Sequence, residues 1–344
     1  MEITLNNNRI IGENHKPYFI AELNTSHFGD VDKAKKMIDM VKECGGDCVK
    51  FQSWSEETLY SNDYYIENPI AKRFVKKFSL NENQLKELSV YARGIGIDFA
   101  STPYSKEEAD FLIHECNVPF IKVASMDINN YPYLRHLAKS NTAIILSTGM
   151  ADFDEIVKAV KVLEESGATN VCVLHCVSIY PVEAEFVNLN NIKLLKKTFA
   201  SQVIGYSDHT LGVDIGIASI ALGACVVEKH VTLDKTIIGM DNQMAIEHSE
   251  LKLMIEGINN VFKSLGLEYR SVSNDELAQR LKMRRSLIVN QDLIAGSILT
   301  ESNLAAKRPG TGISVCEYDS FLGKKLAKSV KKDSLISSDD ILLD

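Results

Sequence analysis

Eight short apolar segments, each followed by an amphipathic stretch, limit the folds open to this chain. The apolar segments are rich in Val, Ile and Phe and cover residues 18–23, 48–53, 98–102, 120–125, 143–148, 171–177, 203–209 and 225–232. They are apolar almost throughout instead of alternating, which predicts strands buried on both faces. The stretches between them carry apolar residues at helical spacing, as Ala34, Met37, Ile38 and Val41 do. This order predicts an α/β fold, a parallel sheet covered by helices.

The number of units separates the two common parallel architectures. Eight strand–helix units within residues 1–266 match a (β/α)8 TIM barrel in number and size. An open doubly wound sheet is usually smaller, with about five or six strands. We therefore expect residues 1–266 to form a catalytic barrel domain.

Two segments depart from the regular pattern. Residues 54–79 form a long insertion after the second expected strand and include Trp54 and three tyrosines. Loops of this length usually have a function, so we expect a lid or an oligomer contact. Residues 3–11 are typical of a β-hairpin, which in a barrel would plug the bottom.

The helix–strand alternation ends after residue 266. Residues 267–284 are polar and are expected to be a linker, followed by a small β-rich domain over residues 285–344. Residues 293–300 are weakly repeated 37 positions later at 330–337, which indicates two pseudo-symmetric halves. A module this small has little core of its own, so we expect it to pack on the barrel or on a partner subunit.

Charge and cysteine usage exclude several classes of function. The chain has 46 acidic and 38 basic side chains and a net charge of −8, which disfavours nucleic acid or an anionic membrane as the main partner. The first residues, MEITLN, do not show the basic-then-apolar pattern of a secretion signal, and no apolar run approaches the roughly 18 residues of a membrane span. The seven cysteines include no C-x-x-C pair and mostly lie in apolar segments, as reduced thiols do. We expect a cytoplasmic protein without disulfides or cysteine-bound zinc.

Polar side chains gather at the carboxyl ends of the expected strands, where TIM barrels carry their chemistry. They are Glu22, Lys50, Gln52, Ser101, Thr102, Lys122, Ser125, Ser147, Thr148, His175, Ser178, Ser207, Asp208, His209, Glu228 and His230. Two lysines among several hydroxyls suit a phosphorylated or dianionic substrate. Ion pairs from Lys50 to Glu22 or from Lys122 to Asp127 are the alternative for the lysines, but they leave the serines unexplained.

Two histidines end neighbouring strands of the expected barrel. His209 and His230 come from the seventh and eighth strands, so their imidazoles could share a divalent cation. The alternative is that each is a hydrogen-bonded core residue. His175, earlier on its strand, is a third candidate ligand.

Nine short motifs together resemble the sialic acid synthase family, which makes N-acetylneuraminate, legionaminate and pseudaminate. They are AELNTSH at 21–27, VKFQ at 49–52, STP at 101–103, LSTGM at 146–150, LHC at 174–176, IYP at 179–181, GYSDHT at 205–210, EKH at 228–230 and KRPG at 307–310. The resemblance runs from about residue 15 to the C-terminus, and the last segment is similar to the antifreeze-like SAF domain of that family.

This resemblance implies a reaction and a set of residues. The family condenses phosphoenolpyruvate with an N-acylated hexose and water, giving a nine-carbon 2-keto sugar acid and phosphate. By position, phosphoenolpyruvate would be held by Lys50, Thr102, Lys122, Ser125, Ser147, Ser178 and Ser207. The catalytic residues would be Glu22, Lys50, His209 and His230. The two histidines would hold a divalent ion. Mn²⁺ is the first candidate, and Mg²⁺ and Co²⁺ are the other two. The sugar would contact Gln52, Asp127, Tyr180, Asp241 and Arg308, the last from the partner in a domain-swapped homodimer.

Two departures leave the acceptor sugar open. Ser26 stands where the family usually has Asn, and Asp127 stands where the sialic acid branch usually has Glu. We expect either N-acetylmannosamine or a 2,4-diacetamido-trideoxy hexose. Other readings of the same residues are a Schiff-base pyruvate aldolase using Lys50 or Lys122, a deoxy-octulosonate-type sugar-phosphate synthase, and a non-enzymatic glycan- or ice-binding protein.

Overall fold

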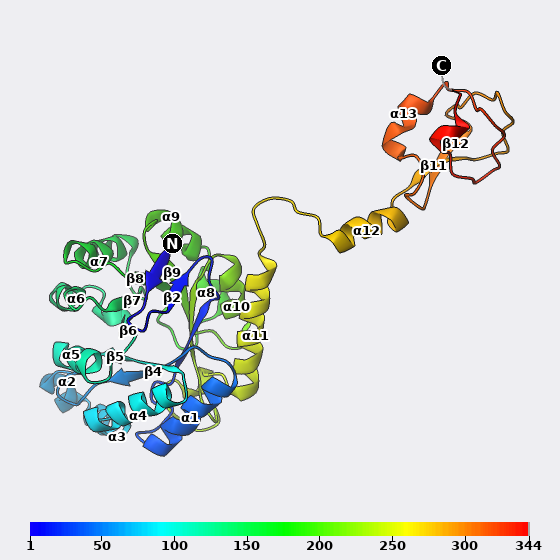
Figure 1. Cartoon of the computed structure of the whole chain (residues 1–344). Helices are drawn as coiled ribbons and strands as arrows, with labels where there is room; N and C mark the ends of the chain where they lie inside the picture. Colours follow the sequence, from blue (N-terminus) through cyan, green and yellow to red (C-terminus); the bar gives the residue numbers. More distant parts are fainter. Residues whose placement is uncertain (343–344) are drawn as a thin grey trace. The chain divides into compact units, whose positions relative to one another are not determined.

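The computed structural model describes residues 1–342, which divide into two compact units, Met1–Leu265 and a second unit from Gly266 onward (Figure 1). The segment expected to be a linker belongs to the second unit and contains helix α12, Asn274–Met283. Each unit is described separately.

The first unit is the expected TIM barrel. Its eight parallel strands are β3 (Tyr18–Glu22), β4 (Cys48–Ser53), β5 (Asp98–Pro103), β6 (Phe120–Val123), β7 (Ala143–Ser147), β8 (Val171–Cys176), β9 (Val203–Asp208) and β10 (Val226–His230). Backbone ladders join them in the order β5-β4-β3-β10-β9-β8-β7-β6. The two end strands, β5 and β6, lie next to each other and nearly close the cylinder.

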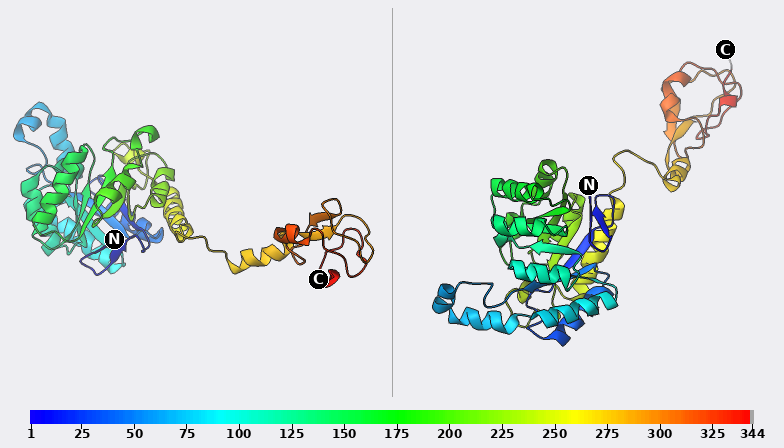
Figure 2. Two further views of the ribbon diagram at one scale, coloured as in Figure 1. Left: turned by 90° about the horizontal axis from the view of Figure 1, so that it is seen from above. Right: turned by 60° about the vertical axis from the view of Figure 1, so that its left-hand side comes forward.

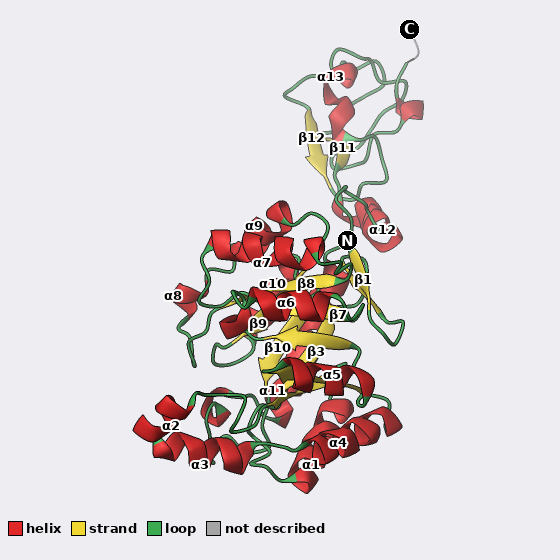
Figure 3. Ribbon diagram, turned by 90° about the vertical axis from the view of Figure 1, so that its left-hand side faces the viewer, coloured by secondary structure: helices red, strands yellow, loops and turns green. Residues whose placement is uncertain are grey.

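Helices surround this sheet on the outside (Figure 3). The barrel helices are α1 (Val31–Glu43), α4 (Glu82–Gly94), α5 (Lys106–His114), α6 (Tyr131–Ala138), α7 (Phe153–Glu165), α8 (Ala184–Val187), α9 (Asn191–Thr198), α10 (Asp214–Ala221) and α11 (His248–Ser264). Short 3₁₀ turns occur at η1 (Ser125–Asp127) and η2 (Asn242–Met244). Helices in the described part of the chain are all too short or too polar to cross a membrane.

Helix α1 shows how local sequence forms these elements. The Asp30 side chain caps its N-terminus by accepting a hydrogen bond from the backbone N–H of Lys33. Ala34, Ile38 and Val41 repeat at helical spacing and are fully buried against the sheet. The same combination of a polar cap and one apolar face recurs in α7, which has a capping box.

Strand residues divide between two cores by strict alternation. Phe19 and Ala21 point outward into the layer between sheet and helices, whereas Ile20 points into the barrel. The inner core also contains Ile3 and Ile11. These come from the antiparallel pair β1 (Glu2–Thr4) and β2 (Ile10–Gly12), so the expected N-terminal hairpin does plug the bottom of the barrel.

The insertion after β4 is helical, not a loop. Residues 54–79 contain α2 (Asn62–Glu67) and α3 (Pro69–Phe78), which project to one side of the barrel in both views of Figure 2. Trp54, Tyr65 and Val75 form a small buried cluster. The expectation of a long irregular loop was wrong because Val75 and Phe78 give α3 an apolar face to bury.

The C-terminal unit is small and mostly irregular. It has one two-stranded antiparallel sheet, β11 (Ser286–Val289) and β12 (Leu304–Lys307), with the short helix α13 (Tyr318–Phe321) and the turns η3 (Val315–Glu317) and η4 (Ser338–Asp340). The two repeated segments meet where Leu293 and Val330 exchange backbone hydrogen bonds of 2.9 and 2.8 Å. Both side chains belong to one apolar core.

Candidate active site

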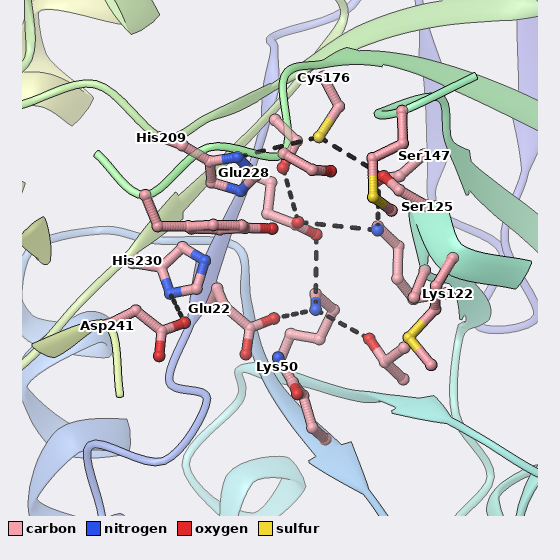
Figure 4. Close-up of a pocket in the computed structure, with 18 of the residues that line it drawn as sticks. Glu22, Lys50, Lys122, Ser125, Ser147, Cys176, His209, Glu228, His230 and Asp241 are labelled. Carbon is pink, nitrogen blue, oxygen red and sulfur yellow. Dashed lines mark hydrogen bonds and ion pairs between the residues drawn. The ribbon is translucent and has the colours of Figure 1, made fainter. Parts of the chain in front are cut away.

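The carboxyl ends of the barrel strands surround a pocket of about 220 Å³ (Figure 4). Fourteen of the residues singled out in the sequence line it: Glu22, Lys50, Gln52, Thr102, Lys122, Ser125, Ser147, Ser178, Tyr180, Ser207, His209, Glu228, His230 and Asp241. They come from strands far apart in the chain, so the barrel brings them together.

Two buried lysines and two buried carboxylates form the base of the pocket. Lys50 Nζ donates to Glu22 Oε2 and to Thr102 Oγ1, the latter at 3.0 Å. Glu228 lies between the lysines, with its oxygens 3.6 Å from Lys50 Nζ and 3.7 Å from Lys122 Nζ. The Lys50–Glu22 ion pair, given above as the alternative explanation for this lysine, is therefore present.

The environment shifts the protonation equilibria of this cluster. Burial lowers the pKa of Lys50 to about 8, although Glu228 partly opposes the shift. Burial also acts to raise the pKa of Glu228, but the charges of Lys122 and Lys50 outweigh it and the net shift is downward. Near neutral pH Lys50 is thus mainly protonated and Glu228 is ionised, so carboxylates at the base of the pocket balance lysine charge.

Hydroxyl groups line the wall beside Lys122. Its ammonium donates to Ser147 Oγ at 2.6 Å, and Ser207 Oγ donates to Glu228 Oε1 at 2.9 Å. Ser125 Oγ accepts the backbone N–H of Gly149 at 3.0 Å. A Cβ on Gly149 would lie 2.1 Å from Ser178 Oγ and 2.8 Å from Ser125 Oγ, so only glycine fits between these two hydroxyls. This array of cations and O–H donors is suited to an anion with several oxygens.

The two histidines lie next to each other, with ring centroids 5.4 Å apart. His209 Nδ1 lies 2.7 Å from the carbonyl oxygen of Val177, which can only accept, so Nδ1 carries a proton and Nε2 is the nitrogen left for a ligand. Burial opposes a charge on this ring, but the surrounding contacts, first among them the one with Cys176, together outweigh burial and raise the pKa of His209. His230 Nδ1 lies 3.4 Å from Asp241 Oδ2. Burial, and then the nearby positive charges, hold the pKa of His230 well below its usual range, so it is neutral.

A polar rim adjoins the histidines. Asn24 Nδ2 donates to Asp241 Oδ2, and burial raises the pKa of Asp241 to about 6. Tyr104 donates its hydroxyl to Gln52 Oε1 at 2.9 Å. The Tyr180 ring lies 4.2 Å from the His209 ring, centroid to centroid. Tyr180 therefore stands next to the imidazoles, whereas Gln52 contacts Tyr104 in the same pocket.

Three candidate residues are not in this pocket. His175 points outward, like Val171 and Val173 of the same strand, and its Nε2 lies 2.7 Å from the carbonyl oxygen of Val187. The prediction of His175 as a third metal ligand is therefore wrong, because strand alternation turns this side chain away from the pocket. Asp127 does not line the pocket; it accepts a hydrogen bond from Asn130 Nδ2 at 3.1 Å. Arg308 follows β12 in the C-terminal unit.

Alternation also explains which other strand-end groups do not face the pocket. Asp208 forms a buried ion pair with Lys229 at 2.8 Å, and Ser101 bonds Ser53 at 2.7 Å. Thr148 donates to the carbonyl oxygen of Leu174 at 2.9 Å. These residues support neighbouring strands instead of lining the pocket.

Two lining residues, Tyr104 and Cys176, were not identified from the sequence, although the same alternation marks them. Tyr104 follows Thr102 by two positions, and Cys176 precedes Ser178 by two. A register that steps by two from each inward-facing residue would have identified both. Glu228 was one of the polar strand-end residues, but no role could be assigned to it from the sequence.

Comparison with known proteins gives this arrangement a context. Residues 37–270 match the NeuB family, and residues 284–342 match the SAF domain. This chain belongs to the NeuB family. The resemblance seen in the sequence motifs, and the small C-terminal domain expected with it, are thereby confirmed.

Several characterised proteins resemble this NeuB-family chain over nearly their whole length. The N,N'-diacetyllegionaminic acid synthase of Campylobacter jejuni is 40% identical and covers 93% of this chain and 99% of its own. The human N-acetylneuraminate-9-phosphate synthase is 35% identical and covers 98% of this chain and 96% of its own. A crystal structure of N-acetylneuraminic acid synthetase from Leptospira borgpetersenii, 33% identical, superposes with a TM-score of 0.75 over 81% of this chain and 95% of its own.

Proposed function

We propose that this protein condenses phosphoenolpyruvate with an N-acylated hexose and water, forming a nonulosonic acid of the sialic type and inorganic phosphate. Carbon 3 of phosphoenolpyruvate bonds to the aldehyde carbon, whose oxygen takes a proton. Water adds to carbon 2, and the tetrahedral intermediate loses phosphate as its C–O bond breaks. The observation that carries the proposal is that two buried lysines, their hydroxyl neighbours and two imidazoles share one pocket. Family membership supports it.

The lysine side of the pocket is suited to phosphoenolpyruvate. Lys50, Lys122 and the hydroxyl groups around them supply charge and O–H donors for a carboxylate and a phosphate. Both lysines are buried, so their contacts act at low dielectric and with little competition from water. The Ser125 and Ser178 hydroxyls, separated by Gly149, would contact the same anion.

The histidine side is suited to a divalent cation. His230 is neutral, and His209 donates its Nδ1 proton to the Val177 carbonyl, so His209 Nε2 is the nitrogen that would ligate the cation, with release of its proton where the ring is charged. Within residues 1–342 no three His, Cys, Asp or Glu side chains converge as a complete metal cluster, so solvent or substrate oxygens would fill the other positions. When bound, Mn²⁺ would act as a Lewis acid on the aldehyde oxygen of the acceptor.

Glu22 stands between the two sides. Its Oε2 accepts from Lys50, and its Oε1 accepts the backbone N–H of Asn24 at 2.7 Å. These two contacts hold the carboxylate in place near the carbon that becomes cationic. We assign Glu22 the role of stabilising that charge or orienting the attacking water. Gln52, Tyr180 and Asp241 would then contact the sugar.

The first experiment measures phosphate release. Purified protein is incubated with phosphoenolpyruvate, Mn²⁺ and a panel of N-acyl hexoses. We expect phosphate only when an acceptor is present, loss of activity with EDTA, and recovery with Mn²⁺. The lowered pKa of Lys50 also suits a Schiff-base aldolase. Trapping of pyruvate by borohydride together with resistance to EDTA would favour that enzyme and refute the proposal.

A second experiment separates the metal site from general damage. His209→Ala should abolish phosphate release and remove bound Mn²⁺, measured by elemental analysis. The control is His248→Ala, an exposed histidine on α11 whose Nε2 lies 3.6 Å from Glu43. Full metal content and rate in His209→Ala would remove this residue from the site.

We further propose that the protein acts as a domain-swapped homodimer in which Arg308 of one protomer contacts the N-acyl group bound in the barrel of its partner. The motif KRPG at 307–310 and the match to the SAF domain support this arrangement.

A further inference from the structure

The carboxyl ends of β9 and β10 carry a buried ion pair to which the proposed function assigns no role. Asp208 Oδ2 and Lys229 Nζ are 2.8 Å apart, and both side chains are fully buried. Strand alternation points them away from the pocket, into the layer between the sheet and its helices. The other outward-facing residues of these strands, Ile204, Tyr206 and Val227, belong to the hydrophobic core of that layer. Apolar residues of similar size would often be as stable there as an ion pair, which must lose its hydration.

The position of this pair in the sheet indicates a different role. Asp208 and Lys229 are the last residues paired in the backbone ladder between β9 and β10. The next residue after each is a pocket imidazole, His209 and His230, and the two rings lie next to each other (Figure 4). The ion pair therefore links the two strands at the point where the ladder stops, one residue before the imidazoles.

Thr210 extends this link past His209. Asp208 Oδ1 accepts the backbone N–H of Thr210 at 3.0 Å and its hydroxyl at 2.8 Å. Lys229 Nζ donates to the carbonyl oxygen of Thr210 at 2.6 Å. The residues on both sides of His209 thus bond to Lys229, which itself precedes His230. We call Asp208, Thr210 and Lys229 the strand-end clamp.

Helices α10 and α11 cover the strand-end clamp. A Cβ on Gly216 of α10 would lie 3.0 Å from Asp208 Oδ2 and 2.2 Å from Met254 Cε of α11, so the glycine allows these groups to approach closely. The Tyr206 hydroxyl also donates to Asp208 Oδ1 at 3.2 Å. A buried polar network whose members are hydrogen-bonded is rigid, so it can fix the geometry of the residues attached to it.

We infer that the strand-end clamp positions the two imidazoles so that both can bind one divalent cation. A metal–nitrogen bond of about 2.1 Å tolerates an error of only about 0.2 Å, so ligands on two separate strands need a fixed separation. The clamp residues are positioning residues, because they act through His209 and His230 and lie outside the pocket. This inference rests on the cation site of the proposed function.

The test separates the position of the imidazoles from general stability. Asp208→Asn combined with Lys229→Met removes both charges together and breaks the link between the strands, but it leaves an amide oxygen to accept from Thr210. We expect the Kd of Mn²⁺, measured by calorimetry on the protein without substrates, to rise by about 10-fold or more. The Kd of phosphoenolpyruvate, measured without metal, should stay within about twofold, because Lys50 and Lys122 lie on β4 and β6. An unchanged Kd of Mn²⁺ in this variant would overturn the inference.

Thr210→Val is a milder variant that decides the question if the double variant does not fold. It replaces the hydroxyl that donates to Asp208 by a methyl group and keeps both charges of the ion pair. The Kd of Mn²⁺ should rise by about threefold or more. The same Kd as in the wild type would overturn the inference.

The control is Tyr18→Phe, which removes the hydrogen bond of 2.7 Å from the buried Tyr18 hydroxyl to Asp98, at the amino end of β3. It should lower the urea midpoint of unfolding but leave the Kd of Mn²⁺ within about twofold. An equal loss of Mn²⁺ affinity in Tyr18→Phe would assign the effect to stability and overturn the inference. A wild-type protein that binds no Mn²⁺ would overturn the cation site and the inference together, whereas phosphate release by the wild type tests the proposed reaction separately.

Discussion

At the scale of single residues, Glu228 has the largest effect on the charge of the site. It is 4% exposed and lies between Lys50 and Lys122, so it shields two buried cations from each other. The same carboxylate competes with an incoming anion for those cations. It therefore stabilises the empty pocket and opposes substrate binding.

We predict that Glu228→Gln has a lower unfolding free energy than the wild type but is stabilised more by phosphoenolpyruvate. Leaving a buried charge without its partner costs about 3 kcal/mol of unfolding free energy. Bound phosphoenolpyruvate would replace the lost negative charge, so the increase in unfolding free energy on adding it should be larger in the variant. Urea unfolding with and without phosphoenolpyruvate measures both quantities.

The control for this prediction is Glu165→Gln, which breaks an exposed pair with Lys161 of 3.6 Å on α7. It should change the unfolding free energy by no more than about 0.5 kcal/mol. A Glu228→Gln protein as stable as this control would show that the carboxylate does not balance the lysines.

The pKa of Lys50 predicts a pH profile. The ammonium binds the anion, and its pKa in the free protein is about 8, so kcat/KM for phosphoenolpyruvate should fall tenfold per pH unit above that value.

The contribution of Lys50 to the unfolding free energy changes in the opposite direction. The folded pKa lies below the unfolded value of 10.5, so the unfolded chain binds more protons between pH 8 and 10.5, and unfolding free energy rises with pH there.

Lys50→Arg is the test of this assignment. Arginine keeps its charge throughout this range, so the alkaline fall in kcat/KM should disappear even if the absolute rate is lower. If the variant shows the same fall near pH 8, the titrating group is not Lys50.

At the scale of elements, the N-terminal hairpin has a structural role and the carboxyl ends of the strands have a chemical one. Ile3 and Ile11 fill the bottom of the barrel, whereas the chemistry lies at the opposite ends of the strands. Most strands contribute an apolar residue to the inner core and, two positions later, a polar residue to the pocket, as Cys48 and Lys50 show. Stability and catalysis are thus separated along each strand.

We therefore predict that Ile11→Ala destabilises the protein without changing its chemistry. Ile11 is 1% exposed, and truncation to alanine leaves a cavity that costs about 2–5 kcal/mol. The neighbouring Ile10 is 42% exposed, so Ile10→Ala should cost no more than about 0.5 kcal/mol. Denaturant unfolding measures the difference, and kcat well below the melting temperature should match the wild type in both. A large loss of kcat in folded Ile11→Ala would mean that the plug also shapes the site.

At the scale of the whole molecule, the open question is how the C-terminal unit contributes to catalysis. The barrel supplies the lysines, hydroxyls and imidazoles by itself. The proposed contribution of the C-terminal unit is limited to Arg308 at the N-acyl group, so it should affect the acceptor and not phosphoenolpyruvate.

We predict that Arg308→Ala raises KM for the acceptor by about 10-fold or more, the usual effect of losing a hydrogen bond from a charged group. KM for phosphoenolpyruvate should stay within about twofold, since that ligand lies among barrel residues. The exposed Arg285 offers a control in the same unit, and Arg285→Ala should change neither constant. An unchanged acceptor KM in Arg308→Ala would remove it from the site.

Mixing two impaired variants then tests the swap. Arg308→Ala and His209→Ala chains, unfolded and refolded together, should reach up to about a quarter of wild-type activity at low acceptor concentration if each barrel uses its partner's arginine. If each barrel uses its own arginine, no site in the mixture has both groups, and activity does not rise above that of Arg308→Ala alone.

The amino-acid sequence alone determined the barrel, the strand ends that carry chemistry and the family, because buried parallel strands and short polar motifs leave a strong local pattern. Tertiary structure was needed to decide which face each side chain takes: it turned His175 outward and placed Glu228 between two lysines. It also folded residues 54–79 into two helices and set Trp54 beside Tyr104. The reason is physical, since these outcomes depend on strand register and on packing between segments far apart in the chain, and neither is encoded in a local run of residues.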